Sequence, residues 1–327
     1  ALEKLLATAD VFICNWRQSP LKRAGLDWET LHEKYPKLVY GYVSGYGEKG
    51  PDKDLPGFDF TAFYARGGIL GPLRDKNSLP MLTVQGFGDH QVAMNLAAGV
   101  LAALFKAKMT GEGDHVVVSL FHSAIWDISL MLQASQYGAD STQYPMERWK
   151  LGNPLVLCYE TADGQWLQIA MPQYDRHYPI LMNAMGYPEL ADDARYYPQK
   201  NLIPNREEFS AWITAEFKKK TCDEWCKLLD ANDLPYAIAQ EWDSLLEDKQ
   251  AWASDCFYEM SYSNGNKRTL VRPPVLFDQM GLPPYERGPY LGEQTKDILG
   301  ELGYSAEAID ELIKSGAAID MDPALRD

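Results

Sequence analysis

Residues 86–120, GFGDHQVAMNLAAGVLAALFKAKMTGEGDHVVVSL, predict a helix, a turn and a buried strand in succession. Apolar residues recur at helical spacing over 90–108, and the β-branched run at 115–120 is typical of a buried strand. The glycine-rich segment 110–114 between them predicts the turn. Asp89 lies just before the helix, so the stretch also places a carboxylate at the start of a helix.

The same alternation continues on both sides of this stretch. The first residues, 1–10, predict the tail of a helix. The elements expected after it are a strand at 11–15, a helix at 28–35, a strand at 38–43 and, beyond the opening stretch, a helix at 122–137. Strands that alternate with helices form parallel sheets. We therefore expect an α/β fold with a Rossmann-like large domain.

A smaller α+β domain is expected to follow. Polar residues and prolines at 144–154 indicate a linker, and 155–170 predict a hairpin that turns at 162–164. The later elements expected are helices at 206–219 and 223–229, strands within 257–276, and helices at 295–303 and 306–315. The predicted domains are 1–145 (large), 146–250 (small) and 251–327 (a return to the large domain).

Composition limits the class of protein. The chain has 327 residues, enough for about two domains, and no apolar run approaches the ~20 residues that cross a bilayer. Five scattered cysteines fit a reducing cytoplasm, and Cys222 and Cys226 lack a second pair of metal-ligating residues, so we expect no metal. The net charge of −15 argues against nucleic acid as a partner.

Asp89 is the strongest candidate for chemistry. Gly86 and Gly88 allow unusual backbone conformations and a close approach of substrate to main-chain N–H groups, which are able to stabilise an oxyanion. An ionised carboxylate attacks an activated acyl group, such as a thioester, without a partner base. Asp is also a common N-cap residue, so the local pattern leaves a structural role open beside the nucleophilic one.

A polyanionic small ligand needs a local group of cations on so acidic a chain. Asn15 and Arg17, followed by Lys22 and Arg23, place an amide and three cations after a predicted strand. A solvated turn explains the same pattern. Residues 45–51 are rich in glycine but lack the Gly-Lys-Ser/Thr of a nucleotide-binding phosphate loop.

Several of these segments together resemble the class III CoA-transferases, which include the formyl-CoA and carnitine enzymes. The resemblance extends over essentially the whole chain. It is carried by ADVFICNWR (9–17), GYG (45–47), GFD (57–59), GD (88–89), TGEGD (110–114) and LGEQT (291–295). The segments GEKGPDKDLPGFD (47–59) and GDHQ (88–91) are most similar to the enzymes of anaerobic amino-acid fermentation that transfer CoA to phenyllactate or 2-hydroxyisocaproate.

The resemblance implies catalytic roles for Asp89, which would form an acyl anhydride and then an aspartyl-CoA thioester, and for its neighbour Gly88. Asn15 and Arg23 match coenzyme A contacts, and Arg17 is added because of its charge. Asp59 matches a second active-site carboxylate, and Phe58 and His90 are expected beside it in the substrate pocket.

The substrates implied are an acyl-CoA and a small carboxylic acid, in an interlaced homodimer. The aromatic side chains Phe58, Phe60, Tyr64 and Trp126 offer surface for an aryl acid, although burial in a core is their more frequent role.

This sequence departs from the family pattern in three places. Pro56 stands where the formyl-CoA enzyme has a CoA-binding Lys, no glycine-rich flap is evident, and the first βα units of the family are absent from the chain. An acyl-CoA racemase of the same fold remains an alternative, although Phe58 stands where racemases carry His before Asp. An inactive scaffold is the other.

Overall fold

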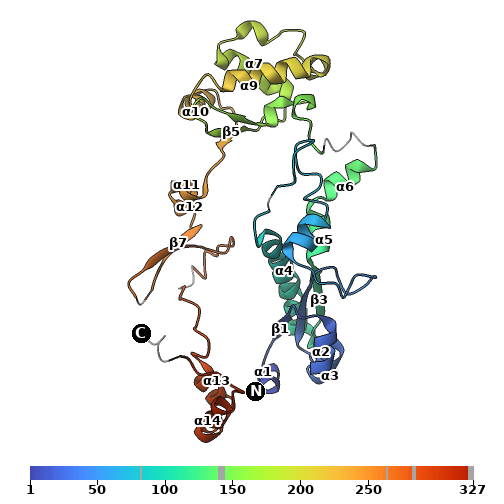
Figure 1. The fold of residues 1–327 in the computed structure, drawn as a ribbon, viewed down its shortest axis with the longest axis vertical. Helices are drawn as coiled ribbons and strands as arrows, with labels where there is room; N and C mark the ends of the chain where they lie inside the picture. Colours follow the sequence, from blue (N-terminus) through green and yellow to red (C-terminus); the bar gives the residue numbers. More distant parts are fainter. Residues whose placement is uncertain (82, 139–143, 263, 282–284, 323–327) are drawn as a thin grey trace. The chain divides into compact units, whose positions relative to one another are not determined.

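The computed structural model describes residues 1–81, 83–138, 144–262, 264–281 and 285–322. The chain divides into two compact units, one of residues 6–238 and one that combines 1–5 with 239–327 (Figure 1). This division does not test the predicted domain boundaries. The boundaries at 145/146 and 250/251, and the return of 251–327 to the large domain, therefore stay predictions.

A parallel sheet forms the base of the larger unit. Its strands are β1 (Val11–Cys14), β2 (Val39–Ser44) and β3 (His115–Ser119), in the order β1-β2-β3. Both pairings are parallel, with Val11 opposite Val39 and Tyr40 opposite His115. The predicted parallel sheet is confirmed. Since parallel strands end at the same edge, the segments that follow β1, β2 and β3 all begin at one edge of this sheet.

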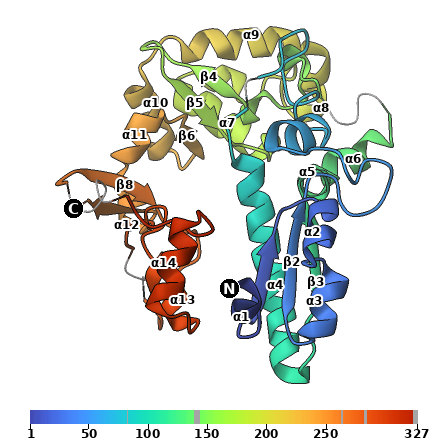
Figure 2. The same ribbon diagram turned by 60° about the horizontal axis from the view of Figure 1, so that its bottom comes forward.

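Helices cover both faces of the sheet. On one face, α4 (Phe87–Thr110) packs Leu96 and Val100 against Val39. On the other, α2 (Gln18–Ala24) and α3 (Trp28–Lys34) pack against Tyr40 and Tyr42. Figure 2 shows α4 on the opposite side of the strands from α2 and α3. This alternation along β2 is what a side-chain period of two requires of a strand buried on both faces.

α4 has 24 residues and is long and apolar enough to span a bilayer by length and composition, with a mean hydropathy of 1.4 over an 18-residue stretch. No other helix in the described ranges meets that test. The helix packs its Val92, Leu96 and Val100 into the unit and is continued by the turn into β3. Of the apolar part of α4, 28% is buried in the structure.

The helix predicted at 122–137 is broken in the structure. α5 (Leu120–Asp127) ends at Ile128, whose ψ of 12° leaves the helical region, and α6 (Ser129–Ser135) begins after it. Ser119 caps α5 by accepting a hydrogen bond from the His122 N–H. The apolar spacing of this segment is helical throughout, so the sequence pattern does not reveal the break.

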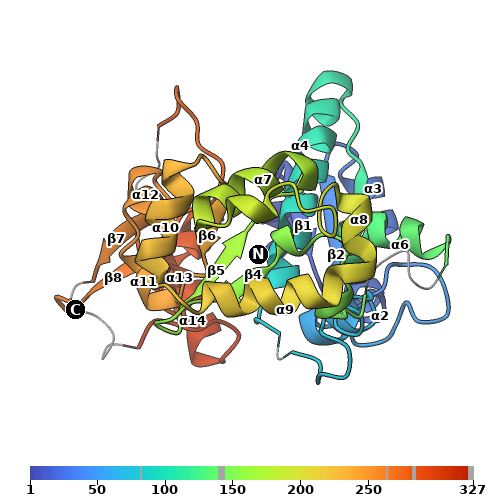
Figure 3. The same cartoon turned by 90° about the horizontal axis from the view of Figure 1, so that it is seen from above.

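A second group of elements in the same unit surrounds an antiparallel sheet of order β4-β5-β6. The hairpin predicted at 155–170 is confirmed. Figure 3 shows α7, α9 and α10 gathered around these strands. The elements are β4 (Cys158–Glu160), β5 (Trp166–Ile169), β6 (Tyr236–Ile238), α7 (Tyr174–Met185), α8 (Gln199–Leu202), α9 (Arg206–Phe217) and α10 (Cys222–Ala231), with single turns η2 (Arg148–Lys150), η3 (Pro154–Val156), η4 (Pro188–Leu190) and η5 (Ile203–Asn205).

The smaller unit contains a two-stranded antiparallel sheet and short helices. Its elements are α11 (Trp242–Leu246), α12 (Lys249–Ala253), β7 (Phe257–Ser261), β8 (Lys267–Val271), α13 (Thr295–Glu301) and α14 (Ala306–Lys314), together with most of α1 (Leu2–Leu6). The Lys4 side chain links the two segments of this unit, 1–5 and 239–327, by donating to the Leu302 carbonyl at 2.6 Å. The strands and helices predicted for this region are confirmed.

Candidate functional site

A close approach of two glycines starts the site. Gly45 follows β2, and the loop after it returns at Gly57. A Cβ atom on Gly45 would lie 2.6 Å from the Gly57 Cα, so only glycine fits there. The chain then enters η1 (Asp59–Ala65), a π-helical turn. This path brings Asp59 to the N-terminus of α4.

The Asp59 carboxylate holds the first turn of α4. It accepts hydrogen bonds from the N–H groups of Gly86 at 2.8 Å and Gly88 at 3.0 Å, and its residue is only 5% exposed. Gly86 is in the left-handed region with φ 78°, and a Cβ on Gly88 would lie 2.3 Å from the Phe63 ring and 2.4 Å from Asp59 Oδ1. The two glycines therefore allow Asp59 to reach the helix end.

Asp89 is not the N-cap. The N-cap residue is Gly86, the helix begins at Phe87, and Asp89 is its third residue. Asp89 is exposed, and among the described residues its carboxylate has no hydrogen-bond or ion-pair partner. The N-cap role left open for Asp89 is thus wrong, because Asp59 satisfies the backbone donors that an N-cap would take.

The two carboxylates have unequal surroundings. Burial raises the pKa of Asp59, the negative charge of Asp89 raises it further, and the hydrogen bonds from the backbone of Gly86, Gly88 and Phe87 act in the opposite direction. Like charges at a shared site disfavour joint ionisation. Asp59 is thus the buried, hydrogen-bonded member of the pair and Asp89 the accessible one.

The backbone donors expected for an oxyanion are already engaged. The Gly86 and Gly88 N–H groups point at Asp59 in this structure. The observed contribution of Gly88 is steric, because any side chain there would displace Asp59 or Phe63.

Aromatic side chains flank the carboxylates. Phe58 precedes Asp59 and is 66% exposed, and Phe87 opens α4 and is 62% exposed. The expectation of core burial is correct for Tyr64, whose hydroxyl donates to the Val84 carbonyl, and wrong for Phe58, Phe60 and Trp126, which are exposed. Phe87 was not among the predicted site residues. Its position outside the buried stripe of α4 is the signal that could have identified it as exposed.

His90, predicted in the substrate pocket, follows Asp89 in the first turn of α4 and is exposed. Its backbone N–H donates to the Gly86 carbonyl at 2.9 Å.

The predicted CoA-binding residues lie at the carboxyl end of β1. Asn15 follows the strand, Arg17 is the N-cap residue of α2, and Arg23 donates to Ser19 Oγ at 2.6 Å. All three predicted residues are exposed. They share the sheet edge with Gly45, which follows β2, but no contact within the described ranges joins them to Asp59 or Asp89.

A half-buried link between this edge and the 45–57 loop was not predicted. Gln18 on α2 donates to Glu48 Oε1 at 2.7 Å, and His115 Nε2 lies 3.5 Å from the same oxygen. The His115 ring stacks on Trp28 with centroids 5.2 Å apart. The link fastens the loop that leads to Asp59. Its members are far apart in sequence, so no local motif signals it.

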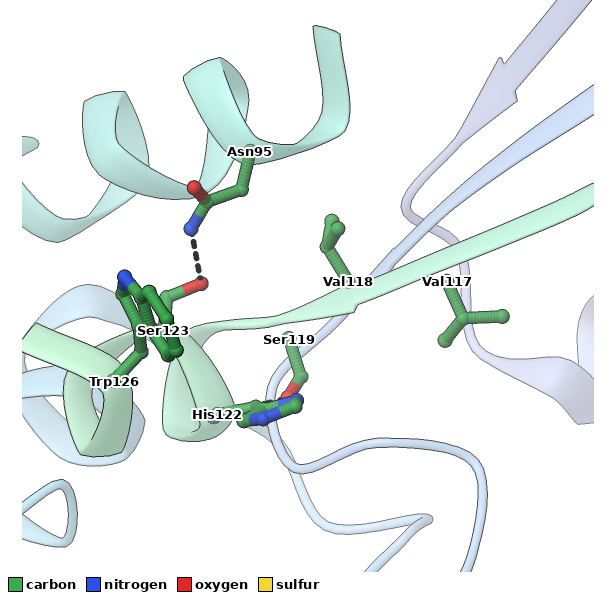
Figure 4. Close-up of a pocket in the computed structure, with 7 residues that line it drawn as sticks. All are labelled: Asn95, Val117, Val118, Ser119, His122, Ser123 and Trp126. Atoms are coloured by element: carbon green, nitrogen blue, oxygen red, sulfur yellow. Dashed lines mark hydrogen bonds between the residues drawn. The ribbon is translucent and has the colours of Figure 1, made fainter. Parts of the chain in front are cut away.

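A separate open cavity of about 290 Å³ lies between α4, the end of β3 and α5 (Figure 4). Asn95 donates to Ser123 Oγ across it at 3.0 Å, and Trp126 and His122 line it. Neither Asp59 nor Asp89 lines this cavity. Among the residues with described positions, no group of three or more His, Cys, Asp or Glu side chains is placed to hold a metal.

Comparison with known proteins identifies the family. The model of CoA-transferase family III matches residues 1–295. The chain is 49% identical over 314 residues to a cinnamoyl-CoA:phenyllactate CoA-transferase from Clostridium sporogenes, covering 96% of this chain and 76% of the relative. It is 39% identical to a (R)-2-hydroxy-4-methylpentanoate CoA-transferase from Clostridioides difficile, covering 94% and 77%.

Solved structures show the same fold. A CAIB/BAIF family protein from Brucella suis matches with a TM-score of 0.76 at 24% identity, covering 92% of this chain and 77% of that one. A protein from Mycobacterium tuberculosis matches with a TM-score of 0.72 at 25% identity, covering 86% and 73%. With the family model matched over most of its length and two named CoA-transferases above 30% identity, this chain belongs to CoA-transferase family III.

Proposed function

We propose that this enzyme transfers CoA between carboxylic acids through a covalent intermediate on Asp89. The observation that supports this most strongly is the difference in surroundings between the carboxylates of Asp59 and Asp89. Asp59 is buried and holds the start of α4, whereas Asp89 is exposed in the first turn with no hydrogen-bond partner in the described part of the chain. An accessible, ionised carboxylate is a competent nucleophile toward a thioester.

The proposed reaction proceeds by four acyl exchanges. The Asp89 carboxylate attacks the thioester carbonyl of the donor, which forms an acyl-aspartyl anhydride and releases the CoA thiolate. The thiolate attacks the aspartyl carbonyl, which forms an aspartyl-CoA thioester and frees the donor acid. The carboxylate of the acceptor then attacks this thioester, and the thiolate released attacks the acceptor carbonyl, which regenerates Asp89.

In this proposal the other site residues bind the substrates or position Asp89. Asn15, Arg17 and Arg23 bind the phosphates of coenzyme A, for which an acidic chain needs local cations. Asp59 fixes the backbone that carries Asp89. Phe58 and His90 contact the acyl group. We further propose a cytoplasmic homodimer, as the family resemblance implies.

The proposed donor is a cinnamoyl-CoA-like thioester, and the proposed acceptor is (R)-phenyllactate or a similar aryl 2-hydroxy acid. The relative at 49% identity bears that activity in its name, and the exposed rings of Phe58 and Phe87 offer contacts for an aryl group. The relative at 39% identity carries the name of a transferase for a branched aliphatic acid, which makes 2-hydroxyisocaproate the second candidate.

Competition between the two acceptors tests the substrate. With one CoA donor and equal concentrations of phenyllactate and 2-hydroxyisocaproate, we expect more phenyllactyl-CoA. Hydrophobic pockets separate such shapes by about 10- to 200-fold for each methylene-sized difference, so the preference should be graded. A preference for the aliphatic acid would contradict the proposed aryl acceptor. Transfer to neither acid would contradict the proposed subfamily. Exchange of the α-proton of an acyl-CoA without CoA transfer would indicate the racemase instead.

A further inference from the structure

A second cavity, of about 840 Å³, is within the size range of small-molecule sites, and neither Asp59 nor Asp89 lines it. It is formed by three segments of the larger unit, at 74–77, 144–152 and 203–206. Among the described lining residues, four side chains are cationic (Arg74, Lys76, Lys150 and Arg206), and Glu147 is the one carboxylate. On a chain with a net charge of −15, this is a local concentration of positive charge.

The backbone holds two of the cations in place. The Lys76 N–H donates to the Met146 carbonyl at 2.7 Å, and the Met146 N–H donates to the Arg74 carbonyl at 2.9 Å. The Arg74 guanidinium in turn donates to the carbonyls of Gly71 at 2.9 Å and Ser78 at 2.5 Å. The wall that carries Arg74 and Lys76 is therefore built before any ligand arrives, which reduces the ordering that binding requires.

The charges of the cavity are incompletely balanced. Glu147 pairs with Lys150 at 2.7 Å and with Lys76, and these two ammonium groups, Lys150 first, lower the pKa of Glu147 to about 2. One carboxylate thus serves two lysines. Arg206 is half-buried, and its side chain has no hydrogen bond or ion pair among the described residues.

Arg206 faces a like charge. Hydrogen bonding to Glu147 raises the pKa of Lys150, while the nearby positive charge of Arg206 acts to lower it. An anion placed between Lys150 and Arg206 would be attracted to both and would remove their repulsion. Arginine presents a planar fork of donors that matches phosphate and carboxylate oxygens.

We propose that this cavity binds a small polyanion through phosphate or carboxylate oxygens, at a site distinct from that of Asp89. Arg206 and Lys150 contact one oxyanion group, and Arg74 and Lys76 line the wall that receives the rest of the ligand.

Calorimetric titration with inorganic pyrophosphate and, separately, with citrate tests the proposal. At least one of the two should bind with a stoichiometry of one per chain. Binding of pyrophosphate alone identifies phosphate as the group recognised, and binding of citrate alone identifies carboxylate. Arg206→Gln should weaken binding by about tenfold, as expected for a lost charge-assisted contact. Arg176→Gln is the matched control, because Arg176 is exposed on α7 outside the cavity, and should bind as the unmodified chain does.

A second variant separates lost charge from lost fold. Glu147→Gln removes the only carboxylate among the described lining residues and should tighten binding several-fold, which a folding defect cannot imitate. The proposal is contradicted if neither anion binds, if Glu147→Gln weakens binding, or if Arg206→Gln leaves it unchanged. It is also contradicted if saturating coenzyme A displaces the anion, because the cavity would then belong to the CoA site.

Discussion

At the scale of single residues, Asp59 and Asp89 are 30 positions apart in sequence and differ in what their carboxylates contact. Asp59 accepts two backbone N–H bonds in a buried place, and Asp89 is exposed. We expect Asp59→Asn to lower the free energy of unfolding by about 1–3 kcal/mol, since the amide turns an N–H donor toward one of the two glycine donors. Chemical denaturation at neutral pH measures this change.

Asp89→Asn is the matched control for that measurement. The substitution is the same, but the side chain is exposed, so stability should change by less than about 0.5 kcal/mol. Equal losses of stability in the two variants would show that Asp59 does not hold the start of α4 in the way described.

A second expectation at this scale concerns the pKa of Asp59. Burial is the largest cause that raises this pKa, and the negative charge of Asp89 is the second. Asp89→Asn should therefore lower the pKa of Asp59. A raised carboxyl pKa means that the folded state binds the proton more tightly. Stability therefore falls as pH rises from the unfolded value of about 3.9 to the folded one. This fall should be smaller in Asp89→Asn.

The measurement is a carboxyl ¹³C NMR titration of Asp59 in both proteins. An Asp59 pKa that is unchanged or higher in Asp89→Asn would mean that the two carboxylates do not interact.

At the scale of elements, the period of the apolar residues predicts the types of the elements well and their ends less well. The parallel strands, the hairpin at 155–170 and the closing helices were predicted. The start of α4 was not, because the helix begins at Phe87 and its backbone donors are satisfied by Asp59 from another segment. The break at Ile128 also leaves the apolar spacing unchanged.

A substitution at Gly88 tests how closely η1 and the start of α4 pack together. A methyl group there would lie 2.3 Å from the Phe63 ring and 2.4 Å from Asp59 Oδ1. Gly88→Ala should therefore lower the free energy of unfolding by about 1–3 kcal/mol through overpacking, and should reduce CoA transfer by displacing the first turn. Thermal or chemical unfolding and the transfer rate measure the two effects.

Gly300→Ala provides the comparison, because Gly300 lies inside α13 with open space around its Cα. It should raise stability slightly, by up to about 1 kcal/mol, through better helix propensity. A Gly88→Ala protein as stable and active as the original would refute the close packing at this junction.

At the scale of the whole molecule, family resemblance predicted what local patterns could not. The prediction that Asp59 is a second active-site carboxylate came from motif similarity, while its hydrogen bonds with the glycine N–H groups needed the structure. The Gln18, Glu48 and His115 link was not predictable either, since it joins three segments that only the folded sheet brings together. The cationic cavity likewise depends on contacts between distant segments.

The binding of coenzyme A is tested at this scale. Arg23→Ala should raise the KM for the CoA donor by about tenfold and change kcat less, the pattern expected when binding common to ground state and transition state is lost. Lys37→Ala, an exposed lysine that precedes β2 and lies outside the group of Asn15, Arg17, Lys22 and Arg23, is the control and should leave KM nearly unchanged. Equal effects of the two substitutions would reduce the role of Arg23 to general surface charge.

The most direct test of the central claim is to trap the covalent intermediate. The protein is incubated with an acyl-CoA, treated with hydroxylamine and digested, and the modified residue is located by mass spectrometry. We predict a single hydroxamate on Asp89, absent without the acyl-CoA, and loss of transfer by about a thousandfold or more in Asp89→Asn. An adduct on Asp59 or elsewhere, or full activity in Asp89→Asn, would contradict the proposal that Asp89 is the nucleophile.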